Sequence, residues 1–157
     1  MAIIHARVDE RLIHGQVAMV WTNTVGASRI VVVNDAAVKD EMVIAALKMA
    51  KPAGVKLSIL SKKRAIEKFA EKAYEEEKVF LITKNVGDMA ALVAADVKIP
   101  AVNIGNVAKH EDSRPIKKSV ELNDIDIAQI KEMIGKGISV TAQMIPNESD
   151  QSILNYF

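Results

Sequence analysis

Residues 29–34 read Arg-Ile-Val-Val-Val-Asn, an uninterrupted apolar segment that ends in a polar residue. A strand whose consecutive side chains are all apolar is typical of a parallel sheet covered on both faces. Residues 78–83, Lys-Val-Phe-Leu-Ile-Thr, have the same character. These two segments predict the buried strands of an α/β sheet.

Strand-like and helix-like patterns alternate outward from these two segments along the whole chain. The predicted strands are 3–8, 29–34, 55–60, 78–83, 102–105, 118–122 and 138–144. The predicted helices are about 15–24, 40–51, 62–72, 86–95, 126–135 and 149–155. Strands separated by such helices are joined by right-handed crossovers. We therefore expect an α/β fold with an open, mostly parallel, doubly wound sheet of about seven strands and helices on both faces.

Local signals support several of these boundaries. Gly26 is suited to end the first helix, and Ser61 to cap the start of the third. Asn123 or Asp124 is suited to cap the helix that follows. The polar segment 106–115 is either a flap over a site or a solvated turn.

Length and composition limit the classes of function. The 157 residues, half of them hydrophobic and 26% charged, fit one globular domain covering 1–157. A net charge of +1 without a long basic block argues against nucleic-acid binding. The absence of cysteine excludes disulfides, thiolate metal sites and cysteine nucleophiles. With no secretory signal and no apolar run long enough to span a bilayer, we expect a cytoplasmic protein.

The segment 7–17, Arg-Val-Asp-Glu-Arg-Leu-Ile-His-Gly-Gln-Val, includes the end of the first predicted strand and the residues directly after it, and it carries the chemistry. In doubly wound sheets, ligands bind beyond the carboxyl ends of the strands. His14 is suited to attack phosphorus through a neutral ring nitrogen, and Arg7 and Arg11 to hold the phosphoryl oxygens. Asp9 is suited to fix the tautomer of the imidazole or to hold an arginine.

Other polar residues are expected to support this site. Gly15 permits a tight turn beside the imidazole, and the helix start after it offers amide groups to an anion. Gln16 either donates to phosphate or caps the turn. Asn34 and Asp35 follow the second strand, and residues 103–106, Asn-Ile-Gly-Asn, end the fifth. All are expected near one crevice.

A purely structural role for His14 stays open at this point, because a histidine between a strand and a helix is often only a hydrogen-bonding residue. For His5 and His110 we favour structural or surface roles. Dinucleotide, Walker A and nucleophile-elbow motifs are missing, and no compact ligand spacing indicates a metal. We expect neither a cofactor nor a metal.

The segment 7–17 closely resembles the signature of the IIB component of the mannose/fructose/sorbose (N-acetylgalactosamine-type) family of the phosphoenolpyruvate-dependent sugar phosphotransferase system. Asn34-Asp35, residues 103–106 and residues 143–146, Gln-Met-Ile-Pro, resemble further landmarks in the expected order. The resemblance spans essentially the full chain. Most other IIB families use a phosphocysteine, which this chain lacks.

The resemblance implies that His14 is phosphorylated on Nδ1 by a phosphohistidine of the IIA protein. His14 then passes the group to a sugar moving through the membrane components IIC and IID. The chain is thus expected to be a protein-Nπ-phosphohistidine–sugar phosphotransferase. We expect it to associate with the inner face of the membrane through IIC and IID. We also consider a homodimer. Some members have an arginine where Gln143 stands. Gln143 supplies no charge, which leaves more of the phosphate binding to Arg7 and Arg11.

Two alternatives from other classes remain. One is a regulatory module that is phosphorylated, or binds a phosphorylated partner, without transferring phosphate to sugar. The other is a nucleotide-binding α/β enzyme, which saturable nucleotide binding would support.

Overall fold

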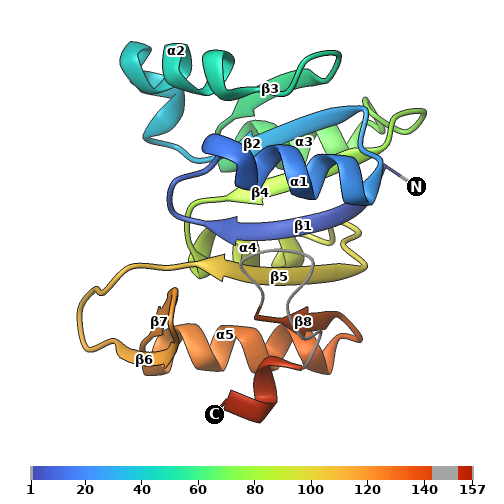
Figure 1. Cartoon of the computed structure of the whole chain (residues 1–157). Coiled ribbons are helices and arrows are strands. Elements are labelled where there is room, and N and C mark those ends of the chain that lie inside the picture. Colours follow the sequence, from blue (N-terminus) through green and yellow to red (C-terminus); the bar gives the residue numbers. More distant parts are fainter. Residues whose placement is uncertain (1, 143–151, 157) are drawn as a thin grey trace.

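The computed structural model describes residues 2–142 and 152–156 and contains an open parallel sheet (Figure 1). Six strands lie in the order β3-β2-β4-β1-β5-β8, and every neighbouring pair is parallel. The bounds are β1 Ile3–Asp9, β2 Arg29–Val33, β3 Lys56–Leu60, β4 Val79–Thr83, β5 Ala101–Asn106 and β8 Ser139–Thr141. The predicted fold class is confirmed, and the two apolar segments form β2 and β4.

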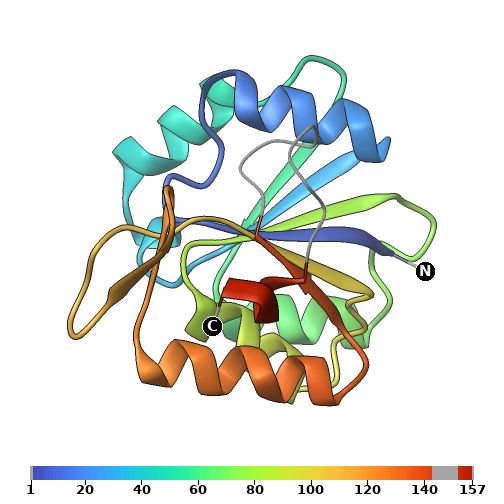
Figure 2. The ribbon, with the colours of Figure 1, turned by 60° about the horizontal axis from the view of Figure 1, so that its bottom comes forward.

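Helices cover both faces of the sheet (Figure 2). Their bounds are α1 Gly15–Val25, α2 Glu41–Ala50, α3 Lys62–Ala70, α4 Val86–Ala94 and α5 Asp124–Gly135, with short 3-10 helices η1 Ala37–Lys39 and η2 Ile153–Tyr156. Figure 2 shows α1 and α2 on one face and α3, α4 and α5 on the other. Right-handed crossovers produce this division, because the chain crosses the sheet in one direction from β1 to β3 and in the other from β3 to β8. In the described part of the chain, no helix is long and apolar enough to cross a bilayer.

The apolar run of β2 is explained by a core on each side of the sheet. Val31 and Val33 belong to the larger cluster, which also contains residues of α4 and α5. Ile30 and Val32 belong to the smaller cluster, which includes Trp21 of α1. Successive side chains of a strand point to opposite faces, so both sets must be apolar.

Capping side chains set the helix starts that the sequence indicated. Ser61 accepts a hydrogen bond from the Arg64 amide, and Asn123 forms a reciprocal capping box with Asp126. Gly26 ends α1 in the left-handed conformation with φ of 71°. These three predicted caps are confirmed.

The predicted sixth strand, 118–122, is wrong in its place in the fold. Its core forms β7 Val120–Leu122, which pairs antiparallel with β6 Arg114–Lys117 in a separate two-stranded sheet. β6 begins inside the segment predicted as a polar loop. The amide of Val107 donates to the Ser119 carbonyl, which fixes this hairpin against the end of β5 instead of extending the main sheet.

The C-terminal predictions are confirmed only in part. Of the predicted strand 138–144, residues 139–141 form β8, and a short 3-10 helix at 153–156 overlaps the end of the predicted helix 149–155. Residues 143–151 lie outside the described residues.

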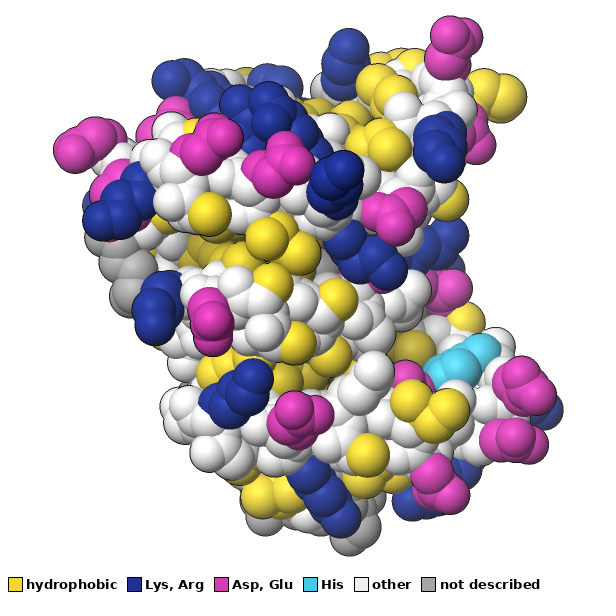
Figure 3. Space-filling model, turned by 180° about the vertical axis from the view of Figure 1, so that it is seen from behind, with side chains coloured by type: hydrophobic (Ala, Val, Ile, Leu, Met, Phe, Trp, Pro, Cys, Tyr) yellow, Lys and Arg dark blue, Asp and Glu magenta, His cyan; other side chains and the backbone are white. Residues whose placement is uncertain are grey.

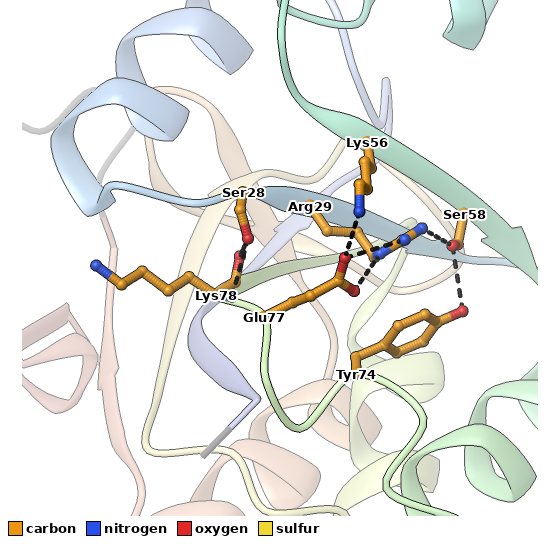
Figure 4. A network of polar contacts seen from close by, with 7 residues as sticks. All are labelled: Ser28, Arg29, Lys56, Ser58, Tyr74, Glu77 and Lys78. Atoms are coloured by element: carbon orange, nitrogen blue, oxygen red, sulfur yellow. Dashed lines mark hydrogen bonds and ion pairs between the residues drawn. The ribbon is translucent and has the colours of Figure 1, made fainter.

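A polar network ties the amino ends of β2, β3 and β4 together (Figure 4). Arg29 donates from Nε to Oε2 of Glu77 at 2.7 Å and from Nη2 to Oε1 at 3.1 Å. Its Nη1 donates to Ser58, which also accepts from the Tyr74 hydroxyl. Lys56 adds a third hydrogen bond to Glu77 at 3.3 Å. The hydrogen bonds from Arg29 hold the pKa of the Glu77 carboxyl below its ordinary value of 4.5, against the opposing effect of partial burial.

Replacing Glu77 by Gln is expected to lower the free energy of unfolding at pH 7 by about 1 kcal/mol. Because the pKa of Glu77 is lowered by folding, its ionised form stabilises the native state above pH 4.5, and this contribution is lost as the pH falls through the folded-state pKa. Urea unfolding from pH 7 into the acid range would measure the difference. The control is Glu67→Gln on the exposed pair with Arg64, which should change stability by less than about 0.5 kcal/mol. A Glu77→Gln deficit that does not shrink with falling pH contradicts the assignment.

Candidate functional site

The segment 9–14 lies at the carboxyl edge of the sheet, where the connections separate. β1 lies between β4 and β5. The chain leaves β1 toward α1 on one face, whereas it leaves β4 toward α4 on the opposite face (Figure 2). Open α/β sheets bind ligands at such switch points.

Two apolar side chains anchor the turn that follows β1. The Leu12 amide donates to the Asp9 carbonyl at 2.9 Å, and Leu12 adopts a φ of 60°. The side chains of Leu12 and Ile13 are buried in the smaller core cluster. Burial of these two offsets the cost of the left-handed backbone at Leu12. Arg11 is exposed, and His14 is 20% exposed.

The carboxylate of Asp9 is the centre of the site. It is 1% exposed and accepts three hydrogen bonds. Oδ2 accepts from Arg7 Nε at 3.1 Å and from His14 Nε2 at 2.9 Å. Oδ1 accepts from the Arg11 amide at 3.0 Å. Asp9 therefore performs both roles that the sequence left open, because it orients the imidazole and also holds an arginine.

The contact with Asp9 selects one tautomer of His14. A carboxylate only accepts hydrogen bonds, so Nε2 carries the hydrogen. In the neutral ring, Nδ1 then carries the lone pair. Within the described part of the chain, no hydrogen-bond partner of Nδ1 is found. The ring thus offers one nitrogen as a nucleophile while the other is held.

Arg7 is buried beneath the turn, with only 2% of its surface exposed. Its guanidinium carbon lies 5.4 Å from the ring centre of Trp21. A Cβ atom at Gly105 would lie 2.1 Å from the same carbon. The guanidinium therefore occupies the space that the Cβ atom of any residue other than glycine would need at position 105. Arg7 contacts Asp9 from inside the fold, whereas Arg11 is the exposed arginine of the segment.

The imidazole sits at the start of α1. His14 is the N-cap residue, with φ of −149° and ψ of 136°, and Gly15 and Gln16 are the first two helical residues. The first amides of a helix lack intrahelical acceptors and attract anions. A phosphoryl group on His14 would meet this favourable field.

The polar residues after β2 form a separate cluster. Asn34 donates from Nδ2 to Asp88 at 3.2 Å and accepts from the Ala37 amide. Asp35 accepts from the Lys62 amide at 2.7 Å, and the Lys62 ammonium lies 3.4 Å from Asp88. Asn34 and Asp35 thus make their contacts with the starts of η1, α3 and α4, not with Asp9.

The remaining predictions concern Gln143 and a metal. Gln143 lies outside the described residues. Within those that are described, no group of three or more His, Cys, Asp or Glu is placed to hold a metal ion.

Sequence reasoning placed Gly105, within residues 103–106, near the crevice but did not foresee its contact with Arg7, and it did not assign Trp21 to the site. A glycine inside a predicted strand is a known sign that another group approaches the backbone closely, so a close approach at Gly105 could have been found. Trp21 is a core residue, with 4% of its surface exposed. Its contact with Arg7 has no signal in the sequence.

Comparison with known proteins identifies the family. The family model of the sorbose subfamily IIB component of the phosphotransferase system (PTS) matches residues 3–157. The chain belongs to this family. The sorbose-specific EIIB component of Klebsiella pneumoniae is 32% identical over 155 residues, covering 99% of this chain and 94% of that protein.

Two further relatives extend the comparison. The crystal structure of the IIBSor domain of the sorbose permease from K. pneumoniae superposes with a TM-score of 0.94, at 32% identity, over 99% of this chain and 96% of that one. The mannose-specific EIIAB component of Escherichia coli K12 is 32% identical over 148 residues, which are 94% of this chain and 46% of that protein. As a IIB component of the PTS, this chain is a phosphotransferase.

Replacing Gly105 by Ala is expected to displace the Arg7 guanidinium and to lower the free energy of unfolding of this IIB component by about 1–3 kcal/mol. Chemical denaturation measures the loss, and the NMR signals of the His14 ring should shift because Asp9 moves with Arg7. The control is Gly135→Ala, where a Cβ meets no atom within 4 Å. Equal stability of the two variants would contradict the close packing of Arg7 on Gly105.

Proposed function

We propose that this chain is a protein-Nπ-phosphohistidine–sugar phosphotransferase. His14 takes a phosphoryl group from a phosphohistidine of the IIA protein and passes it to a sugar carried by the membrane proteins IIC and IID. The observation that carries the proposal is the oxygen of Asp9 that Arg7 and His14 share. It engages Nε2 and leaves Nδ1 available, the nitrogen at which the family resemblance predicts phosphorylation.

In the first step, the lone pair of Nδ1 attacks phosphorus in line with the phosphorus–nitrogen bond of the donor. That bond breaks, and its electron pair returns to the donor imidazole. The ring of His14 keeps its hydrogen on Nε2 and becomes positively charged. The buried carboxylate of Asp9, 2.9 Å from Nε2, stabilises the charge as it forms.

In the second step, a sugar hydroxyl oxygen attacks phosphorus, and the proton of the hydroxyl passes to water. The bond between phosphorus and Nδ1 breaks, and the electron pair returns to Nδ1. His14 is thereby restored in the tautomer that Asp9 selects, ready for another donor. Transfer of this kind requires positioning and charge stabilisation more than proton transfer by the carrier.

The two arginines have different roles in this proposal. Arg7 is buried and donates to Asp9, so it positions the carboxylate and balances its charge. Arg11 is exposed and lies close to His14 in the sequence, and its amide donates to Asp9. We assign the phosphoryl oxygens to Arg11 and to the first amides of α1, at Gly15 and Gln16.

The other predicted residues and partners have smaller roles in this proposal. Asn34 and Asp35 shape the neighbouring turns through Asp88 and Lys62, and we propose no contact of theirs with phosphate. A role for Gln143 stays a prediction, as does a homodimer. Peripheral attachment to the inner face of the membrane through IIC and IID is part of the proposal.

Phosphorylation of the intact protein tests the proposal. Incubation with phosphoenolpyruvate, the general PTS proteins and IIA is expected to add one acid-labile, base-stable phosphate. Peptide mass spectrometry distinguishes His14 from the other two histidines, His5 and His110. His14→Ala should take up none, and retained labelling of that variant would refute the assignment.

Sugar transfer separates the enzyme from the regulatory module. Membranes containing matched IIC and IID should convert a sugar to its phosphate with the labelled protein, and sorbose and mannose are the first sugars to test. Phosphorylation at His14 without transfer to any sugar would favour the regulatory alternative.

Replacing Arg11 by Ala is expected to slow both steps by about 10- to 100-fold, which is the usual loss for one hydrogen bond to a charged group. Arg11→Lys should restore only part of the rate, because the two-pronged contact is lost. Quenched-flow labelling and sugar phosphorylation measure the two steps. Arg64→Ala, at an exposed arginine on α3, is the matched control. An unchanged rate for Arg11→Ala would remove Arg11 from the site.

A further inference from the structure

A cleft of about 420 Å³ opens beside the candidate site, on the α4–α5 side of the sheet. Its walls come from the chain after β1, β4 and β5 and from the first turns of α5. The face of α3, α4 and α5 carries charges of both signs around hydrophobic side chains (Figure 3). The roles proposed above for Asp9, Arg11 and His14 do not use this cleft.

The cleft is continuous with the phosphoryl-transfer site through one residue. Glu10 lines it and stands between Asp9 and Arg11 in the turn. The Glu10 amide donates to the Asn106 carbonyl at 2.9 Å, which fixes this wall to the end of β5. A molecule seated in the cleft therefore touches the turn that holds the imidazole.

His110 makes the opposite wall rigid. Its Nδ1 lies 2.9 Å from the Ala108 carbonyl oxygen, and its Nε2 lies 2.7 Å from Oδ2 of Asp126. Both partners are acceptors, and only the charged form of the ring donates from both nitrogens. The hydrogen bond to Ala108 raises the pKa of His110, and Asp126 adds to the effect, while partial burial opposes it. Since Asp126 also belongs to the capping box of α5, this loop is fastened to a helix end and is not a free flap.

The chemistry of the lining fits a protein segment better than a sugar. Val86, Val107 and Ile125 give it an apolar surface, and Ile125 is 68% exposed. Lys84 and Lys109 add two ammonium groups at the cleft, which outnumber the carboxylate of Glu10, and the carboxylate of Asp126 is already engaged by His110. The described lining includes no Phe, Tyr or Trp to stack against a sugar ring. Aliphatic side chains flanked by carboxylates would match these groups.

The opposite face of the sheet has a different character. On α2, Met42 is 83% and Met49 is 88% exposed, and Met19 of α1 is 48% exposed. Lasting interfaces are the more apolar ones, whereas brief encounters between soluble proteins use small patches of mixed polarity and electrostatic attraction. The cleft is of the second kind.

We propose that this cleft is the docking site for the phosphoryl donor protein, and that it receives an acidic, aliphatic segment of that protein beside its phosphohistidine. The proposal rests on the proposed function, which makes IIA the donor. Docking there brings the partner against Glu10 and so against the turn that holds His14. The fastened loop keeps the cleft formed before the partner arrives, which lowers the cost of ordering.

The test compares a protein donor with a small one. Ile125→Glu places a charge in the cleft at an exposed position and should raise the KM for phosphorylated IIA by about tenfold, with little change in kcat. Labelling of His14 by phosphoramidate, which needs no docking, should match wild type. The matched control is Met49→Glu on the opposite face, with an unchanged KM for IIA. Lys84→Glu combined with Lys109→Glu should raise KM and weaken its dependence on salt.

Each outcome of these measurements either supports or overturns the docking proposal. An unchanged KM for IIA in Ile125→Glu overturns the proposal, as does a defect confined to transfer from phosphorylated His14 to sugar, which would assign the cleft to the membrane components. Loss of phosphoramidate labelling in Ile125→Glu also overturns it, because the cleft would then act on the reacting site itself. Failure of wild type to label at His14 with either donor would instead refute the proposed function.

Discussion

The candidate site depends on one buried carboxylate oxygen, Oδ2 of Asp9, which accepts from both Arg7 and His14. Burying a carboxylate is costly unless a cation and hydrogen-bond donors compensate it. Arg7 supplies the cation, the Arg11 amide supplies a further donor, and Gly105 leaves the space in which Arg7 fits. Removal of any one of these would weaken that compensation, so the position of the imidazole depends on the residues that hold Asp9.

The sheet decides where this group of residues can act. β1 runs through the middle of the molecule between β4 and β5, and its carboxyl end is the point where helices leave to opposite faces. Leu12 and Ile13 then fix the turn to the core, which leaves Arg11 and His14 toward solvent. A solvent-exposed side chain on a rigid turn suits a residue that must meet large partners, because the partners reach the side chain without rearranging the core.

Much of this could be predicted from the sequence because it depends on local patterns. The apolar runs gave the buried strands β2 and β4, Ser61 and Asn123 marked helix starts, and segment 7–17 marked the site. The hairpin β6–β7 could not be predicted, since it is held by the contact of Val107 with Ser119 and not by its own pattern. Nor could the burial of Arg7, which depends on Gly105 in a strand far away in the sequence, or the pairing of Asn34 with Asp88 of α4.

The single open nitrogen of His14 has a consequence for the order of events. If Nδ1 both receives and gives up the phosphoryl group, donor and acceptor must occupy the same approach to the ring and therefore exclude each other. Each cycle then includes the departure of one protein before the other can arrive. Under the proposed function, spent donor that stays bound would compete with the sugar-bearing membrane proteins for the same ring.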